Sequence, residues 1–111
     1  MEITEQRQGG VTVLSPVGRI NNETSPAFQV RLLSCVGSTA GKVLIDFSGV
    51  EYISSAGLRA LMMASKQSKA TSGRLAVSGL TPMVKEIFAI SRFALVVQVF
   101  ETSAEALAAL G

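Results

Sequence analysis

Histidine and tryptophan are absent from this sequence of 111 residues, and cysteine occurs once, as Cys35. Without histidine, neither a Ser-His-Asp nor a Cys-His catalytic site can be built. A single cysteine excludes a disulfide within the chain and the zinc sites that need two cysteines. We therefore expect a reducing, cytoplasmic location, Cys35 as a small residue in the core, and neither a metal site nor a cofactor.

The charged residues are few and scattered. Ten lysines and arginines stand against eight acidic residues, for a net charge of +2, and aromatic residues make up only 5%. Nucleic-acid binding would need a basic stripe with aromatic stacking platforms, so we expect no nucleic-acid partner. The first residues lack the basic and apolar pattern of a signal peptide, and no apolar run approaches the roughly 20 residues of a membrane span.

What the sequence does contain is 48% hydrophobic residues, enough for one domain over residues 1–111 with a largely aliphatic core. The pattern predicts strands over 2–7 and 11–17, paired as a hairpin around Gly9 and Gly10, with a loop over 18–22. Ser25 and Pro26 predict the N-cap and first position of a helix that ends within 37–41.

The second half alternates between strands and helices. The pattern predicts strands over 43–45, 75–77 and 95–100, and helices over 56–72, after Thr81-Pro82, and from Thr102 with its capping partner Glu105. Gly73 is expected to cap the helix over 56–72. This order predicts an α/β fold with about four helices and a mostly parallel sheet of about five strands, including the antiparallel hairpin.

Two serines stand where a loop meets a helix. The connection from Asp46 to Ser55 follows a central strand, and functional loops of α/β sheets lie at this end. A hydroxyl on Ser54 or Ser55 would lie beside unpaired N–H groups and the positive end of the helix dipole, which accept anions. The position predicts a phosphorylation-switched binding module, with simple helix capping as the alternative because serine is a favoured N-cap.

Three carboxylates leave an enzyme open as another alternative. Asp46 ends a central strand, and Glu23 and Glu51 lie in neighbouring loops, so a Mg²⁺-dependent enzyme is conceivable. The chain has no P-loop, no Gly-x-Gly-x-x-Gly and no Ser-x-x-Lys. We therefore expect a binding protein and not an enzyme.

The segment Asp46 to Arg59, DFSGVEYISSAGLR, resembles the signature of STAS domains, and more narrowly that of bacterial anti-sigma factor antagonists. Weaker similarity in GRIN at 18–21 and PMVKEIF at 82–88 extends the resemblance over nearly the whole chain. It implies a STAS fold and partner switching. The mechanism that the resemblance implies is that the unphosphorylated protein would bind an anti-sigma factor that is also a serine kinase. Phosphorylation would release it, and a PP2C-type phosphatase would reverse the modification.

The resemblance also implies the site residues. The implied acceptor is Ser55. Ser54 stands where the family often has Asp, so it offers a second candidate hydroxyl. Asn21 likewise replaces a common Asp, and both changes would alter recognition by the kinase. A different assembly is the alternative, in which the chain would be a docking subunit of a lipid-transport ABC complex or of a stressosome-like scaffold. The expected partner-binding residues are Asn21, Ser25, Ser54, Gly57, Leu58 and Met62.

Overall fold

The computed structural model describes residues 1–37 and 41–111. Within this part of the chain the predicted α/β class is confirmed, with four α-helices and one strand more than the five expected. In chain order the elements are β1 (Glu2–Gln8), β2 (Val11–Ile20), α1 (Ser25–Val36), β3 (Lys42–Asp46), β4 (Val50–Ile53), α2 (Ser55–Ala70), β5 (Arg74–Ser78), α3 (Pro82–Ser91), the 3₁₀ helix η1 (Phe93–Leu95), β6 (Gln98–Phe100) and α4 (Ser103–Leu110).

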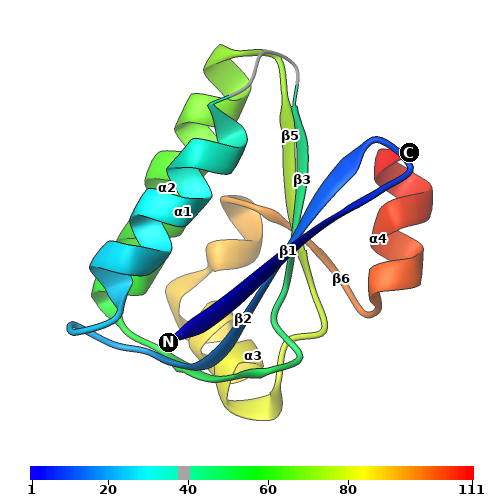
Figure 1. Ribbon diagram of the computed structural model, residues 1–111. Helices are drawn as coiled ribbons and strands as arrows, with labels where there is room; N and C mark the ends of the chain where they lie inside the picture. Colours follow the sequence, from blue (N-terminus) through cyan, green and yellow to red (C-terminus); the bar gives the residue numbers. More distant parts are fainter. Residues whose placement is uncertain (38–40) are drawn as a thin grey trace.

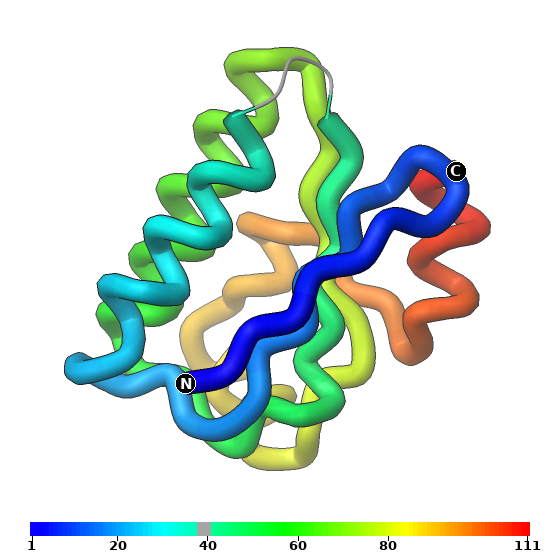
Figure 2. Tube along the Cα trace, viewed as in Figure 1, coloured from blue at the N-terminus to red at the C-terminus, as the bar shows by residue number. Residues whose placement is uncertain are grey.

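The sheet separates two layers of helices (Figure 1). Its strand order is β1-β2-β3-β5-β6, with β4 paired to β2. The hairpin β1–β2 is antiparallel, and the other pairs are parallel. On one face, α1, α2 and α3 bury the larger apolar cluster; on the other, α4 covers a smaller one. The C-terminal end of α4 packs near the start of β2, because Leu110 and Val11 share that smaller cluster (Figure 2).

On the side away from β1, strand β2 pairs with two strands in succession. Val11–Leu14 pairs with β3, whereas Gly18–Ile20 pairs with β4, and the register shifts between Gly18 and Arg19. The loop predicted over 18–22 is therefore wrong for residues 18–20, and the loop predicted over 46–55 contains β4. The sequence hid both because Gly18 (φ +110°) and Gly49 resemble turn residues, while β4 is only four residues long.

The core is less purely aliphatic than expected. The ring of Phe88 packs edge-to-face against Phe47 at 5.9 Å and against Phe93 at 5.4 Å between centroids. These rings hold α3 and η1 against the end of β3. Such pairs stabilise a core by about 0.5–1.5 kcal/mol each beyond the area that they bury.

Several predicted boundaries are also wrong. The strand expected over 95–100 is η1 followed by β6, because Arg92 in the left-handed conformation (φ +55°) ends α3 and turns the chain before the strand begins. Helix α2 ends at Ala70 with Thr71 as its C-cap, so Gly73 is not the cap. Helix α1 ends at Val36 with Gly37 as its C-cap, and the remainder of the predicted ending, residues 38–40, lies outside the described residues.

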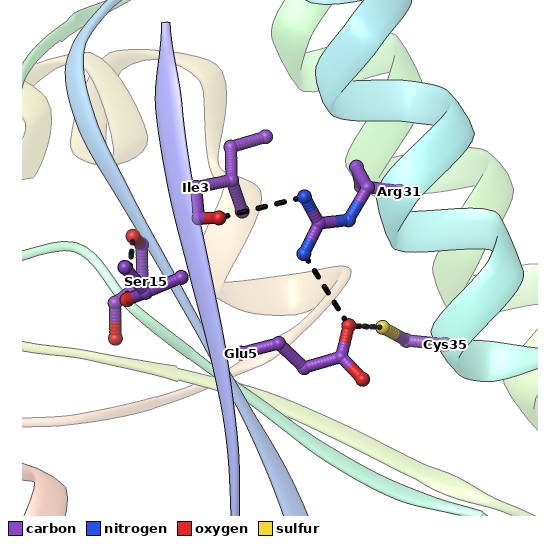
Figure 3. Close-up of polar contacts among 6 residues, drawn as sticks. Ile3, Glu5, Ser15, Arg31 and Cys35 are labelled. Atoms are coloured by element: carbon purple, nitrogen blue, oxygen red, sulfur yellow. Dashed lines mark hydrogen bonds and ion pairs between the residues drawn. The ribbon is translucent and has the colours of Figure 1, made fainter.

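The edge strand β1 is tied to α1 by a small polar cluster (Figure 3). Arg31 Nη2 lies 3.4 Å from Glu5 Oε1, and Arg31 Nη1 donates to the Ile3 carbonyl at 3.4 Å. Cys35 Sγ donates to the same Glu5 oxygen at 3.5 Å. The thiol is half-buried, and burial followed by the Glu5 charge raises its pKa to about 11.

Candidate functional site

The candidate site lies where two parallel strands end side by side. Strands β2 and β4 finish at Ile20 and Ile53, which are register partners. The amide of Ser54 donates to the Ile20 carbonyl at 2.8 Å, which holds the start of α2 directly against the end of β2. The predicted serines therefore lie at the carboxyl end of the sheet, where open α/β folds place their binding loops.

Ser54 is the N-cap of α2. Its Oγ accepts a hydrogen bond from the Gly57 amide at 3.3 Å, and its carbonyl accepts from the Leu58 amide at 2.9 Å. Only 8% of the residue is exposed. The capping alternative is therefore correct for Ser54, and its hydroxyl is turned inward and already engaged.

Ser55 differs from Ser54 in its position, its exposure and the bonding of its side chain. It is the first residue of α2, it is exposed, and its hydroxyl has no hydrogen-bond partner among the residues that the structure describes. The first turn of α2 contains no acidic residue. An anion on the Ser55 side chain would thus meet the positive end of a 16-residue helix without a neighbouring carboxylate in that turn.

Gly57 is required by close packing. A Cβ atom at this position would lie 2.7 Å from Ile20 Cγ2 and 2.7 Å from Ile53 Cγ1. The glycine therefore lets the first turn of α2 rest on the last residues of β2 and β4. Because this contact sets the depth of the helix, it also sets how far Ser55 stands out of the surface.

The loop from β2 to α1 is held by Asn21. Its Oδ1 accepts from the amides of Glu23 and Thr24 at 3.0 and 3.1 Å, and Thr24 Oγ1 donates to the Arg19 carbonyl at 2.7 Å. Thr24, not Ser25, is the N-cap of α1, and Ser25 is inside the helix with 6% exposure. The Asn-x-x-Thr spacing could have indicated this turn from the sequence.

The apolar side chains near the serines differ in exposure. Leu58 is half-buried against the main core, whereas Met62 and Met63 are 39% and 41% exposed on α2. Met63 Sδ lies 3.6 Å from Gln29 Nε2 of α1. Ser55 and Met62 are therefore exposed on α2 and Leu58 is half-buried, whereas Ser25, Ser54 and Gly57 are buried.

Two contacts at this end of the fold were missed by sequence reasoning. The Arg19 guanidinium lies 4.7 Å from the centroid of the Tyr52 ring, across neighbouring strands. Thr81 Oγ1 donates to the Val50 carbonyl at 2.7 Å, so its side chain ties α3 to β4 and does not cap α3. Both contacts depend on β4, which the sequence did not reveal.

The candidate carboxylates do not form a metal centre. Asp46 Oδ1 accepts from the Ser48 amide at 2.9 Å and closes the turn between β3 and β4. Within residues 1–37 and 41–111, no group of three or more acidic, cysteine or histidine side chains is arranged to hold a metal ion. Among the helices in that same part of the chain, none is long and apolar enough to cross a bilayer.

Comparison with known proteins gives three informative relatives. A Bordetella bronchiseptica protein, BtrV, which carries the name of an anti-sigma factor antagonist, is 31% identical over 93 residues, covering 84% of this chain and 80% of that one. A STAS protein from Planctomyces limnophilus, solved as an anti-sigma-factor antagonist, has a TM-score of 0.87 at 27% identity, covering 98% and 97% of the two chains.

The third relative shares the fold at lower identity. SpoIIAA of Bacillus has been solved unphosphorylated (TM-score 0.76, 14% identity, 96% and 93% of the chains) and phosphorylated (0.73, 13%, 99% and 100%). A family model for the STAS domain matches residues 2–106. The sheet with its antiparallel hairpin, the serine-bearing start of α2 and these matches together show that the chain belongs to the STAS domain family.

Proposed function

We propose that this protein is an anti-sigma factor antagonist controlled by phosphorylation of Ser55. In this proposal the unmodified protein binds an anti-sigma factor that is also a serine kinase, and the kinase releases it by phosphorylating Ser55. A PP2C-type phosphatase restores the binding form. In this proposal the protein acts by binding its partner and not by catalysing a reaction. The names of the related proteins support the antagonist role.

One observation carries the choice of Ser55. Two adjacent serines begin α2, yet Ser54 is buried with its Oγ bonded to the Gly57 amide, whereas Ser55 is exposed. A kinase must bring the acceptor hydroxyl to the γ-phosphate of ATP. Ser54 could reach a kinase only after the helix start had opened, so the accessible hydroxyl of Ser55 is the better acceptor.

A phosphate at Ser55 can act as a switch without a change of fold. It adds about 1.5–2 negative charges and three acceptor oxygens. In the free protein the start of α2 stabilises these charges. In a complex the same group would face a surface fitted to a neutral hydroxyl, and burying an unpaired charge costs about 2–5 kcal/mol. This cost corresponds to a loss of affinity of roughly thirty-fold to several thousand-fold.

The six expected partner-binding residues stay predictions, and we propose that some contact the partner whereas the others support the site. Met62 and Leu58 have accessible side-chain surface beside Ser55, and we propose that they contact the partner directly. Flexible methionine side chains suit such an adaptable contact. The other residues support the shape of the site from below, through the hydrogen bonds of Asn21 and the burial of Ser25, Ser54 and Gly57.

The test has two stages. Peptide mapping by mass spectrometry of protein from its native host should find one phosphoryl group on Ser55, retained in Ser54→Ala and lost in Ser55→Ala. Capture from host extract should then recover an anti-sigma kinase on the unmodified protein. Protein carrying phosphoserine at position 55 should bind that kinase at least about thirty-fold more weakly.

Equal capture by both forms would refute the switch. Capture of a transporter ATPase or of scaffold proteins by both forms would favour the alternative role of a docking subunit. A phosphoryl group on Ser54 alone would show that the helix start opens during recognition, and would move the acceptor by one residue.

A further inference from the structure

Arg59 stands one helical turn after Ser55 in α2, at the i, i+4 spacing, and both residues are exposed. Side chains at this spacing lie on the same helix face, with Cβ atoms about 5–6 Å apart. The remaining helical neighbours of Arg59 at three or four positions are Ala56, Met62 and Met63. None of them is charged, so the helix offers Arg59 no carboxylate partner.

The lack of acidic residues extends along the helix. The sequence of α2, SAGLRALMMASKQSKA, contains three basic residues and no aspartate or glutamate. Within residues 1–37 and 41–111 the ion pairs are Arg31–Glu5 and Lys85–Glu101, and neither involves Arg59. The guanidinium is therefore a cation beside the acceptor serine with no anionic partner in the described part of the unmodified protein.

Physical chemistry favours a phosphate as the missing partner. An anion placed N-terminal to a cation at i, i+4 is the better order for an ion pair on a helix, because it also agrees with the helix dipole. The planar guanidinium presents paired N–H donors that match two phosphate oxygens. A phosphate on Ser55 would interact both with the N-terminus of α2 and with the paired N–H donors of the Arg59 guanidinium.

We propose that Arg59 is the clamp for phosphoserine 55, holding its phosphate against the first turn of α2. The inference rests on the proposed phosphorylation of Ser55 and adds a positioning residue to it. Arg59 keeps the phosphate on the surface of the protein and fixes its orientation. It thereby stabilises the modified form and turns the added charge toward the surface that the partner would cover.

The test uses the full chain with phosphoserine installed at position 55 during translation, so no kinase is required. Titration of the phosphate by ³¹P NMR is compared for the unaltered sequence, Arg59→Gln and Lys66→Gln. A free phosphoserine releases its second proton at about pH 6. We expect Arg59→Gln to raise the proton affinity of the phosphate about twofold, the size of one i, i+4 ion pair.

Lys66 is the matched control, because it is an exposed cation of the same helix, two turns beyond Arg59. Lys66→Gln should leave the titration unchanged, and 1 M salt should remove the difference that Arg59 makes, because the screening length falls to about 3 Å. Other charged groups at this end of the fold are Arg19, Glu23 and Glu51, which are the same in all three proteins, so their effect cancels.

An identical phosphate pKa in the three proteins would overturn the proposed role of Arg59. An equal shift of that pKa in Lys66→Gln would also overturn it, because the shift would then reflect net charge alone. Circular dichroism shows whether each variant remains folded. The failure of the clamp is separable from failure of the proposed function. The phosphate is supplied by translation here, whereas the kinase acceptor is identified by mapping the protein from its host.

Discussion

The Gly57 amide donates its hydrogen bond to Ser54 Oγ at 3.3 Å, whereas the adjacent Ser55 hydroxyl has no partner among the residues that the structure describes. Ser54 is held inside the start of α2 with 8% exposure, while Ser55 is presented to solvent. Under the proposed function, the pair would separate two tasks that a single serine would have to combine, which are starting the helix and accepting a modification.

This separation predicts different costs for two alanine substitutions. Ser54→Ala removes the cap and should lower the free energy of unfolding by about 0.5–2 kcal/mol. Ser55→Ala removes an exposed hydroxyl and should change it by less than about 0.5 kcal/mol. Urea denaturation followed by circular dichroism measures both. Equal losses in the two variants would contradict the assignment of Ser54 as the N-cap.

Gly57→Ala should destabilise the protein although alanine is the better helix former. A Cβ atom 2.7 Å from Ile20 Cγ2 and Ile53 Cγ1 overpacks the site, at a cost of about 1–3 kcal/mol. In open space the same change would stabilise a helix by about 1 kcal/mol. Urea denaturation of the variant gives the sign directly.

The control for Gly57→Ala is a double-mutant cycle with Ile53→Ala, which removes one of the two clashing atoms. The combined variant should be more stable than the sum of the separate losses predicts. Additive losses would mean that the strain at Gly57 does not arise from the contact with Ile53.

Thr81→Val should weaken the attachment of α3 to β4. The substitution keeps the shape of the side chain and removes the hydrogen bond of 2.7 Å to the Val50 carbonyl. Leaving that part-buried carbonyl without its donor should cost about 1–3 kcal/mol, measured by thermal or urea unfolding. Thr81→Ser retains the hydroxyl and is the matched control, and a loss as large in Thr81→Ser would point to the methyl group.

The Cys35 thiol predicts how the stability of the protein depends on pH. Burial and the Glu5 charge raise the pKa of the thiol from 9.0 to about 11, so the folded protein favours the neutral form. Its contribution to stability is complete below pH 9 and is lost as the pH rises toward 11, because the unfolded chain releases the proton first. The urea midpoint of the unaltered protein should therefore fall more steeply over this range than that of Cys35→Ser.

A second measurement checks the cause of that shift. Titration of the thiolate absorbance should show a lower pKa for Cys35 in Glu5→Gln, because the substitution removes a nearby negative charge. Glu2→Gln, an exposed acid on the same strand, is the control and should leave the titration in place. An unchanged pKa in Glu5→Gln would leave burial as the entire cause.

The sequence alone predicts those elements whose own residues carry the signal. Of the stripe predicted in α1, Phe28, Leu32 and Val36 are buried as their spacing indicates, whereas Cys35, expected in the core, is only half-buried at its edge. Thr102 Oγ1 accepts from the Glu105 amide at 3.1 Å as the capping pair predicts. The position of Ser54 and Ser55 at the start of a helix also follows from local pattern. In each case the residues that carry the signal lie within one element or at its cap.

The features that were missed depend on contacts between elements. Strand β4 is stabilised by pairing with the second half of β2, and neither segment is recognisable without the other. Likewise the Thr81-Pro82 pattern indicates a cap, but the hydroxyl donates to the Val50 carbonyl and accepts no bond from an amide of α3. The opposite exposure of the two serines depends on how the start of α2 packs against the rest of the fold, which no local pattern reveals.

The register between β2 and β4 has a consequence for which changes of sequence this segment can accept. Because Ile20 pairs with Ile53, the end of β4 has a fixed position in the sheet, and α2 begins two residues after it. Inserting or deleting one residue between β4 and α2 would rotate the helix by about 100° and turn a different side chain outward. We therefore expect this connection to accept changes of composition but not of length if Ser55 is to stay exposed.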